Sequence, residues 1–211
     1  MAKEFYTVAR KAEKEIIIKK SRFIAYVAPT ATEKDAEEFI AEIKKKHKDA
    51  THNVSAFIVG REKQVQRAND DGEPNGTAGK PVLEVLKNKE LTDVTVVVTR
   101  YFGGIKLGAG GLIRAYGKSA IEGIEAAGEV VRKLFRLVAI KMDYSMFGAV
   151  QRTVEDLDLP IDGIDYTDKV TMKVLVPEDD SDNFIKRMID FTNDNAIIEK
   201  EDTRYLNFSR N

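Results

Sequence analysis

The sequence predicts a mixed α+β protein built from two domains in series. Its 211 residues suffice for one large domain or two small ones. Segments with strand-like composition and segments with helical periodicity alternate along the whole chain. Beyond residue 129 they follow the order strand, helix, strand, strand, helix, strand, which is typical of a ferredoxin-like unit. We therefore expect two α+β sandwiches, each a sheet with helices on one face.

The first half opens with two short strands and a helix. Residues 15–21 and 22–28 have the β-branched and aromatic composition of strands, and a proline closes the second. Residues 30–48 predict a helix, in which Thr30 and Glu33 form a capping box. Its apolar stripe consists of Ala36, Phe39, Ile40 and Ile43.

A hairpin, an acidic turn and a second helix come next. Residues 54–60 and 63–68 predict the two strands of the hairpin, and residues 69–76 carry the glycines and the proline of a turn. Thr77 is the expected N-cap of a helix over 78–88, where a proline is tolerated because it lies in the first turn.

The first half closes with its most apolar strand and its longest helix. Residues 92–101 contain four valines and predict a buried strand. A glycine-rich loop follows over 102–111, and a helix then runs to about Ala127, with Gly128 as its C-terminal stop.

The second half contains six further elements. Strands are expected over 134–144, 161–166, 169–176 and 196–205, and helices over 146–157 and 181–191. We place the two domains at residues 1–130 and 135–211 and expect them to fold independently, because the helix stop and a change in charge coincide at the boundary.

The net charge of −1 conceals an asymmetry between the two halves. Residues 1–134 carry 24 Lys and Arg against 19 Asp and Glu, whereas residues 135–211 carry 10 against 16. The basic run over 44–48 lies at the negative dipole end of the first helix, which favours it there; a nucleic-acid patch is the alternative. The asymmetry indicates two units with different partners.

The composition excludes several classes of protein. Without cysteine there are no disulfides, thiol nucleophiles or cysteine-based metal sites, and two histidines are too few for a three-histidine zinc site. We expect no metal ion and no cofactor. No apolar run is long enough to span a bilayer, and the charged N-terminus does not resemble a signal peptide, so a cytoplasmic protein is expected.

The acidic turn is the densest group of chemically active residues. Asp70, Asp71 and Glu73 place three carboxylates within four positions and so could hold a divalent cation through water. The alternative, which we favour, is that the aspartates brace the turn through hydrogen bonds to the backbone, while Gly72 and Gly76 supply positive φ angles.

The glycine-rich loop leaves a buried strand and enters a helix, a geometry that presents backbone N–H groups to an anion. It matches neither the mononucleotide P-loop nor the dinucleotide fingerprint. Arg100, Lys106 and Arg114 are close enough in sequence to clamp a phosphate. The alternative for Gly110 and Gly111 is that they only permit close packing of the helix on the sheet, and the two interpretations are compatible.

No catalytic residue is assigned. Ser119 lies in the middle of a predicted helix and not in a nucleophile elbow. His52 precedes a strand and is the best candidate for a general base, although a strand-capping histidine is the commoner arrangement.

Two long motifs resemble the signature of the YigZ/IMPACT family. The first, Asp-Asp-Gly-Glu-Pro-x-Gly-Thr-Ala-Gly-x-Pro, runs from Asp70 to Pro81. The second, Val-Thr-Arg-Tyr-Phe-Gly-Gly-x-Lys-Leu-Gly-Ala-Gly-Gly-Leu-x-Arg-Ala-Tyr, runs from Val98 to Tyr116. Residues 20–25 and 50–53 fit the same family, and the resemblance extends over the whole chain.

The resemblance implies a fold and a set of site residues. The first domain should be of the ribosomal-protein-S-five-like α/β type and the second ferredoxin-like, a pair similar to the fourth and fifth domains of elongation factor G. Carried over by motif position, the candidate RNA or anion contacts are Arg100, Tyr101, Gly103, Gly104, Lys106, Gly110, Gly111 and Arg114. The residues of a structural or ion-binding turn are His52, Asn53, Asp70, Asp71 and Glu73.

The function implied is control of translation, because the eukaryotic relative restrains the kinase that responds to amino-acid starvation. We therefore expect a non-catalytic regulator of translation or the stress response that binds RNA, the ribosome or a regulatory protein, as a monomer or weak oligomer. One alternative is an enzyme acting on a phosphorylated substrate, and another is a protein-interaction module with an acidic second domain. If the acidic turn supports the loop, Asp70, Asp71 and Glu73 should meet Arg100 and Lys106 at the ends of parallel neighbouring strands.

Overall fold

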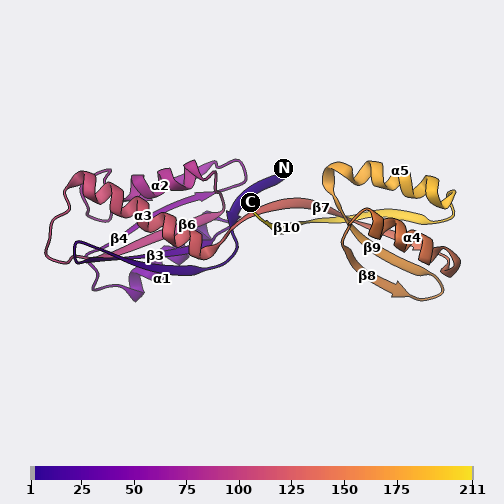
Figure 1. Cartoon of the computed structure of the whole chain (residues 1–211), viewed down its shortest axis with the longest axis horizontal. Helices are drawn as coiled ribbons and strands as arrows, with labels where there is room; N and C mark the ends of the chain where they lie inside the picture. The colour runs from indigo at the N-terminus through magenta and orange to yellow at the C-terminus, as the bar shows by residue number, and fades with distance from the viewer. Residues whose placement is uncertain (1–2, 211) are drawn as a thin grey trace. The chain divides into compact units, whose positions relative to one another are not determined.

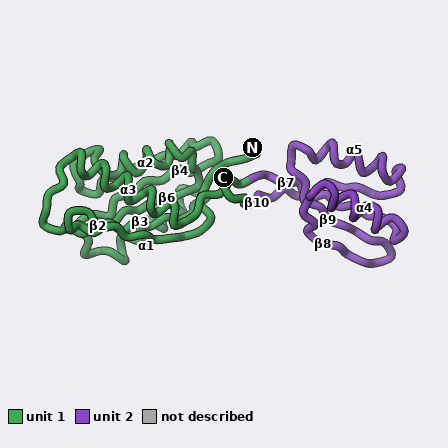
Figure 2. The backbone as a smooth tube through the Cα atoms, in the orientation of Figure 1, with its two compact units in different colours: residues 1–132, 207–211 green, residues 133–206 purple. Residues whose placement is uncertain are grey.

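The computed structural model describes residues 3–210, and the chain forms two compact units (Figure 2). The first unit comprises residues 1–132 together with 207–211, and the second comprises 133–206. The chain leaves the first unit within one strand, β7 (Glu129–Met142), and returns within another, β10 (Ile197–Ser209). Whether 135–211 folds by itself remains a prediction, since its last residues belong to the first compact unit.

The first unit is built on a five-stranded antiparallel sheet with the order β2-β3-β6-β4-β5 (Figure 1). Its strands are β2 (Ala12–Ile18), β3 (Ser21–Pro29), β4 (His52–Val59), β5 (Val65–Asn69) and β6 (Val94–Tyr101). A further strand, β1 (Glu4–Val8), pairs with β7 and was not expected, because five residues give too short a pattern to be distinguished from a loop.

Helices cover both faces of this sheet, so the expectation of helices on one face is wrong for the first unit. The helices are α1 (Glu33–Lys46), α2 (Gly79–Asn88) and α3 (Ala109–Ala127). Ala25 and Val27 of β3 pack with α2 and α3, whereas their neighbours Ile24 and Tyr26 point to the other face and pack with α1. Alternate residues of β3 are thus buried on opposite faces of the sheet. Because both faces are covered, the sequence of the strand is apolar at consecutive positions.

Two helix starts differ from those expected. The capping box of α1 is formed by Thr32 and Asp35, while Thr30 instead shares a hydrogen bond with Thr95 at 2.8 Å. Thr77 does not cap α2, since its hydroxyl donates to the carbonyl of Pro74. Thr30 and Thr32 both precede α1, and only the tertiary contacts decide which of them becomes the cap.

The second unit has the predicted ferredoxin-like order of elements. After β7 come α4 (Tyr144–Asp156), β8 (Ile161–Tyr166), β9 (Val170–Pro177), the 3₁₀ turn η1 (Glu178–Asp180), α5 (Ser181–Thr192) and β10. Its strand order is β10-β7-β9-β8, and α4 and α5 pack with the sheet residues in one apolar core. The predicted class, two mixed α/β domains with a ferredoxin-like second domain, is confirmed.

The strands that join the units are longer than expected. β7 begins at Glu129 and not at 134, and β10 ends at Ser209 and not at 205. The added residues of β7 lie in the first unit, where β7 pairs with β1. Such pairing is non-local, so no pattern in the chain marks where it stops.

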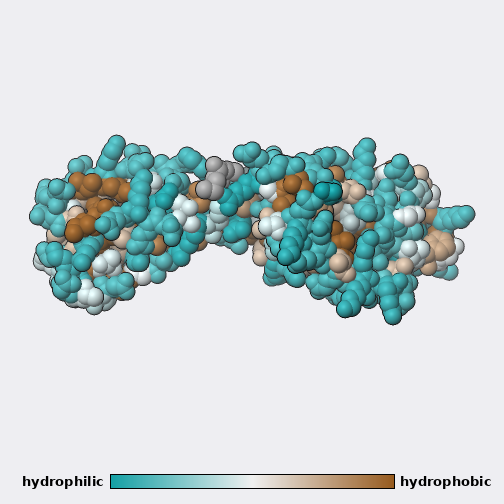
Figure 3. All heavy atoms as spheres, turned by 180° about the vertical axis from the view of Figure 1, so that it is seen from behind, coloured by the Kyte–Doolittle hydropathy of each residue, from teal (hydrophilic) through white to brown (hydrophobic). Residues whose placement is uncertain are grey.

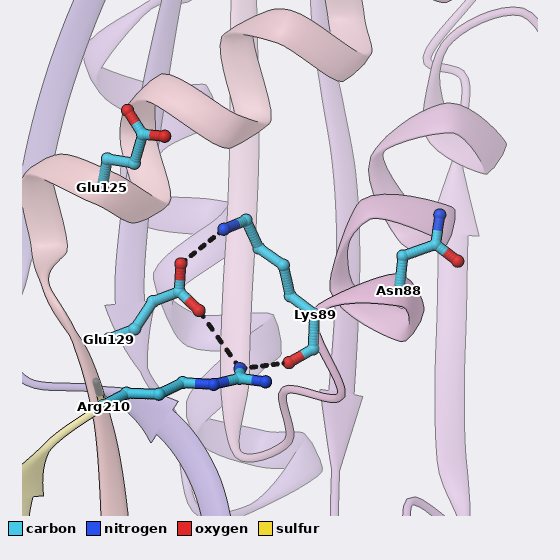
Figure 4. Close-up of a pocket in the computed structure, with 5 residues that line it drawn as sticks. All are labelled: Asn88, Lys89, Glu125, Glu129 and Arg210. Carbon is cyan, nitrogen blue, oxygen red and sulfur yellow. Dashed lines mark hydrogen bonds and ion pairs between the residues drawn. The ribbon is translucent and has the colours of Figure 1, made fainter.

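Arg210, at the C-terminal end, is held within the first unit (Figure 4). Its guanidinium donates to the carbonyl oxygen of Lys89, lies 3.2 Å from Glu129 Oε2 and stacks 3.9 Å from the ring centre of Tyr6. Lys89 Nζ in turn donates to the same glutamate. Lys89, Glu129 and Arg210 line a hollow of about 510 Å³ together with Asn88 and Glu125. The charges of Lys89 and Arg210 are paired there with Glu129.

The surface is mostly polar. On the face that Figure 3 shows, hydrophobic side chains reach the surface in small patches among hydrophilic ones. Among the described residues, no helix is both long and apolar enough to cross a bilayer.

Arg210→Ala should lower the free energy of unfolding of the first unit by about 1–2 kcal/mol, because Glu129 and the Lys89 carbonyl lose a charged donor. Urea denaturation followed by circular dichroism measures the change. Arg187→Ala, which removes an exposed arginine of α5, is the control and should change stability by less than about 0.5 kcal/mol. Equal stability of the two variants would show that the contacts of Arg210 with Glu129 and Lys89 do not stabilise the first unit.

Candidate functional site

A buried ion pair lies beneath the glycine-rich loop. Arg100, near the end of β6, donates from Nη1 to Glu73 Oε1 at 2.5 Å. The two residues are only 5% and 8% exposed. Their strands are not parallel neighbours as expected: β5 and β6 run parallel, but β4 lies between them. The acidic turn after β5 brings Glu73 to Arg100.

Other elements of the first unit converge on this pair. Tyr116 of α3 donates its hydroxyl to Glu73 Oε1 at 2.8 Å, and burial together with this carboxylate raises the pKa of Tyr116 far above its usual value. Ser21 Oγ, at the start of β3, accepts from Arg100 Nη2 at 3.5 Å and from the Gly103 N–H at 3.2 Å. His52 Nε2 lies 3.8 Å from Glu73 Oε2. The pair therefore joins β3, β4, β6, α3 and the acidic turn.

Asp70 performs the capping that the sequence assigned to Thr77. Its carboxylate accepts hydrogen bonds from the N–H groups of Gly76, Ala78 and Gly79, at 2.8, 3.1 and 2.8 Å. These donors include the first N–H groups of α2, which have no partner within the helix. Asp70 thus fixes the path of the chain from β5 into α2.

Asp71 joins the turn to α1 and β4. Its carboxylate accepts from Lys44 Nζ at 2.7 Å and from the Asn53 N–H at 2.6 Å, and its carbonyl oxygen contacts His52 Nδ1 at 2.8 Å. Burial alone would raise the pKa of Asp71, but the lysine and the Asn53 N–H outweigh burial and lower it. Asp71 is therefore a carboxylate with its charge already compensated.

The three carboxylates of the turn do not face a common point. The Asp70 carboxylate accepts hydrogen bonds from backbone N–H groups, and that of Asp71 pairs with Lys44. The Glu73 carboxylate accepts from Arg100 and Tyr116. Within residues 3–210, no group of three or more acidic or histidine side chains is placed to hold a metal ion. These contacts are the ones expected of a turn that braces the fold, and that role of the turn stays a prediction.

The glycine-rich loop lies at the surface above this network. Phe102 is 47% and Ile105 41% exposed, and Gly104, Lys106 and Gly110 are also exposed. Gly103 must be a glycine, since an added Cβ would stand 2.1 Å from the backbone of Lys20. The loop is thereby held against the turn between β2 and β3.

The start of α3 is open to solvent. Its N-cap is Gly108, which has a φ of 72° and offers no side-chain cap to the first N–H groups of the helix. An added Cβ at Gly110 would meet the Arg114 side chain at 3.8 Å, and one at Gly111 would meet the Leu107 side chain at 3.0 Å. Close packing on the sheet is made instead by Gly123, whose added Cβ would lie 2.7 Å from that of Ala25.

A hollow of about 230 Å³ lies beside this helix start. Lys19, Arg114 and Lys118 line it, together with four uncharged residues and no carboxylate. Between Arg100 and Ile121 the chain contains four cations and no acidic residue. This side of the loop is therefore positively charged, whereas Arg100 itself is withdrawn into the interior.

Tyr101 and Asn53 belong to a second polar cluster on the α1 side. His47 lies between two tyrosines, with Tyr26 Oη 2.6 Å from Nε2 and Tyr101 Oη 2.8 Å from Nδ1. Asn53 donates to the His47 carbonyl and accepts from Thr99. Burial, with a contribution from Lys46, lowers the pKa of His47 below its usual value.

The structure adds residues that the sequence interpretation did not assign to the site. Tyr116 and Ser21 complete the network around Arg100, Lys44 neutralises Asp71, and Lys19 and Lys118 line the hollow. Tyr116 and Ser21 lie within the segments that carry the family resemblance. Membership of those segments was the one sequence feature that could have indicated a role for these two residues. Lys44 was assigned to a helix end, with a nucleic-acid patch as the alternative, and its pairing with Asp71 was not foreseen because the two residues lie 27 positions apart.

Comparison with known proteins gives the family. The Impact N-terminal domain model matches residues 19–124, and a domain of unknown function, DUF1949, matches residues 140–195. The chain is 46% identical over 206 residues to the IMPACT family member YvyE of Bacillus subtilis, covering 98% of this chain and 95% of that protein. The Escherichia coli family member YigZ is 33% identical over 177 residues, with 83% and 87% covered. The chain belongs to the IMPACT family.

A solved structure resembles this chain over nearly its whole length, whereas a eukaryotic relative matches less than half of it. A crystal structure of a hypothetical protein superposes with a TM-score of 0.62 and 30% identity, covering 94% of this chain and 97% of that one. Protein IMPACT of Bos taurus is 37% identical over 95 residues, which are 43% of this chain and 29% of that protein.

Glu73→Gln should destabilise the first unit by about 3–5 kcal/mol, because it leaves the Arg100 guanidinium buried without a counter-charge. Tyr116→Phe keeps the pair and removes one hydrogen bond to a carboxylate, so a smaller loss of about 1.5–3 kcal/mol is expected. Chemical denaturation measures both changes. A Glu73→Gln protein as stable as the wild type would contradict the structural role of the pair.

Stability should also depend on pH through His47. A histidine whose pKa is lowered in the folded state stabilises the protein above its unfolded pKa, about 6.5, and this contribution is lost as the pH falls. Between about pH 7 and pH 5.5 the wild type should lose more stability than His47→Gln. Urea midpoints at both pH values test this. An equal loss in the two proteins would show that His47 does not titrate as described.

Proposed function

We propose that this IMPACT family protein is a non-catalytic, cytoplasmic regulator that binds single-stranded RNA, including ribosomal RNA, through the first unit. The binding surface consists of the exposed loop and the cations beside it, and we call it the loop surface. It comprises Lys19, Lys20, Phe102, Ile105, Lys106, Arg114 and Lys118. The role in translation rests on the family resemblance.

One observation carries the binding proposal. The carboxylates of the acidic turn are engaged by donors of the protein itself, while the loop above them exposes an aromatic ring among cations. Single-stranded nucleic acids are bound by this combination, in which aromatic rings stack on bases and cations follow the phosphates. The backbone N–H groups at the open start of α3 add further donors to phosphate.

The arrangement favours binding over catalysis on a phosphorylated substrate. For that chemistry the acidic turn would have to share a pocket with the glycine-rich loop and hold a metal ion or a water molecule. In this protein Glu73 is directed at Arg100 and Tyr116, and Asp71 at Lys44. A substrate that used Glu73 would have to displace its buried partners, at the cost of leaving the Arg100 charge uncompensated.

RNA affinity should fall with salt, at a slope of roughly −0.7 per phosphate neutralised. Substituting Lys19, Lys106 and Arg114 by alanine should reduce the magnitude of this slope by about two units. Fluorescence anisotropy of a labelled oligouridylate at several salt concentrations measures it. Arg100 is left unchanged, because its loss would disturb the buried pair.

A matched control substitutes Lys34, Lys87 and Lys186, three exposed lysines that are not part of the loop surface, and should retain the wild-type slope. Phe102→Ala should weaken binding about tenfold and keep the slope, because it removes stacking but no charge. If the slope is the same in the loop-surface variant and in the control, RNA binds elsewhere, and the basic run over 44–48 becomes the site to test.

A further inference from the structure

The second unit presents a cluster of aromatic side chains to solvent. Tyr144, at the start of α4, and Tyr166, at the end of β8, are 54% and 59% exposed. Their rings stack with centroids 6.4 Å apart, and Phe147 meets Tyr166 edge-on at 5.8 Å. The Tyr144 hydroxyl donates to the carbonyl of Thr167 at 2.7 Å, which fixes its ring. Fixed and exposed aromatic rings are the commonest anchors of binding surfaces.

This cluster lies at the end of an open sheet edge. In the order β10-β7-β9-β8, the strand β8 pairs with β9 on one side and with no other strand of residues 3–210 on the other. An edge strand has unpaired N–H and C=O groups that can accept an additional strand. The register shift between Ile161 and Gly163 shortens the regular part of the edge to the four residues from Gly163 to Tyr166.

The charge around this edge selects the partner. Residues 155–168, which lead into β8 and away from it, contain six carboxylates and no lysine or arginine. They are Glu155, Asp156, Asp158, Asp162, Asp165 and Asp168. Asp162 is paired with Arg204 of β10, and Lys169 pairs with Asp143 nearby, whereas Asp165 extends from β8 into solvent.

Negative charge on an edge strand has two consequences. It opposes pairing with the same edge of a second copy, since like charges would lie opposite one another. It also opposes RNA, because the phosphates would approach the carboxylates that flank β8. The same charge attracts a cationic strand, and a guanidinium can lie over the exposed face of a tyrosine.

We propose that the outer edge of β8 binds an extended, arginine-rich segment of a partner protein by strand addition. The main chain of the segment pairs with the open N–H and C=O groups of β8. Its arginines contact Asp165 and Asp168 and stack on Tyr166 and Tyr144 at the end of the strand. This site is independent of the loop surface and of RNA binding.

The test titrates the ¹⁵N-labelled full-length protein with a short synthetic peptide in which pairs of arginines alternate with single valines, so that arginines lie on both faces of the added strand. Amide resonances of Asp162 to Tyr166 should shift, and those of Phe102 to Gly111 should not. Two further peptides are compared, one with glutamate in place of arginine and one with N-methylated backbone positions that cannot donate hydrogen bonds. Both should bind at least tenfold more weakly.

Variants of the protein separate the aromatic contribution from the charge. Tyr166→Ala should weaken peptide binding about tenfold, and the double variant Asp165→Asn/Asp168→Asn should weaken it most at low salt. Phe191→Ala removes an aromatic ring of α5 that is 46% exposed and should bind as the wild type does. Thermal melting of each variant confirms that it remains folded.

Several results would overturn the proposal. Shifts confined to residues outside β8 and its flanks would place peptide binding elsewhere. Equal binding of the N-methylated peptide would exclude strand addition, and equal binding of the glutamate peptide would exclude selection by charge. If oligouridylate shifts the β8 amides more than the cationic peptide does, the edge is a nucleic-acid site and not a protein-docking site.

Discussion

The buried pair of Arg100 and Glu73 is the interaction on which the arrangement of the first unit depends. It joins the end of β6 to the acidic turn, and through Tyr116 and Ser21 it reaches α3 and the start of β3. An ion pair this deeply buried adds little net stability compared with apolar residues, but losing one partner leaves the other charge uncompensated. The pair therefore determines which elements pack together, and these elements position the glycine-rich loop above it.

This constraint separates two sets of charges. The carboxylates of the acidic turn contact groups of the protein itself. Asp70 caps α2, Asp71 pairs with Lys44, and Glu73 pairs with Arg100. The cations near the loop are directed outward, with Lys19, Arg114 and Lys118 around a hollow free of acidic residues. A motif rich in both signs of charge thus presents mainly its positive part to a ligand, which is the physical basis of the proposed RNA binding.

The second unit has the opposite electrostatic character. Its open edge strand is flanked by carboxylates and ends at exposed tyrosines, so it suits a cationic segment and repels nucleic acid. The strands β7 and β10 join the two units. After β10, Arg210 contacts Glu129 and Lys89 of the first unit. The protein thus carries two surfaces of unlike charge, and the two proposed partners, RNA and a cationic protein segment, are of different classes.

The sequence alone determined the order of helices and strands from β2 onward, the ferredoxin-like pattern and the motifs that surround the site, because periodicity, glycines and prolines act locally. It did not determine that α1 covers the second face of the sheet, that β4 separates β5 from β6, or that Asp70 and Thr32 cap helices assigned to Thr77 and Thr30. Nor did it reveal that Arg100 is buried while Lys19 and Lys118 face the hollow. These features depend on which distant donors and acceptors meet, and only the packed tertiary structure decides that.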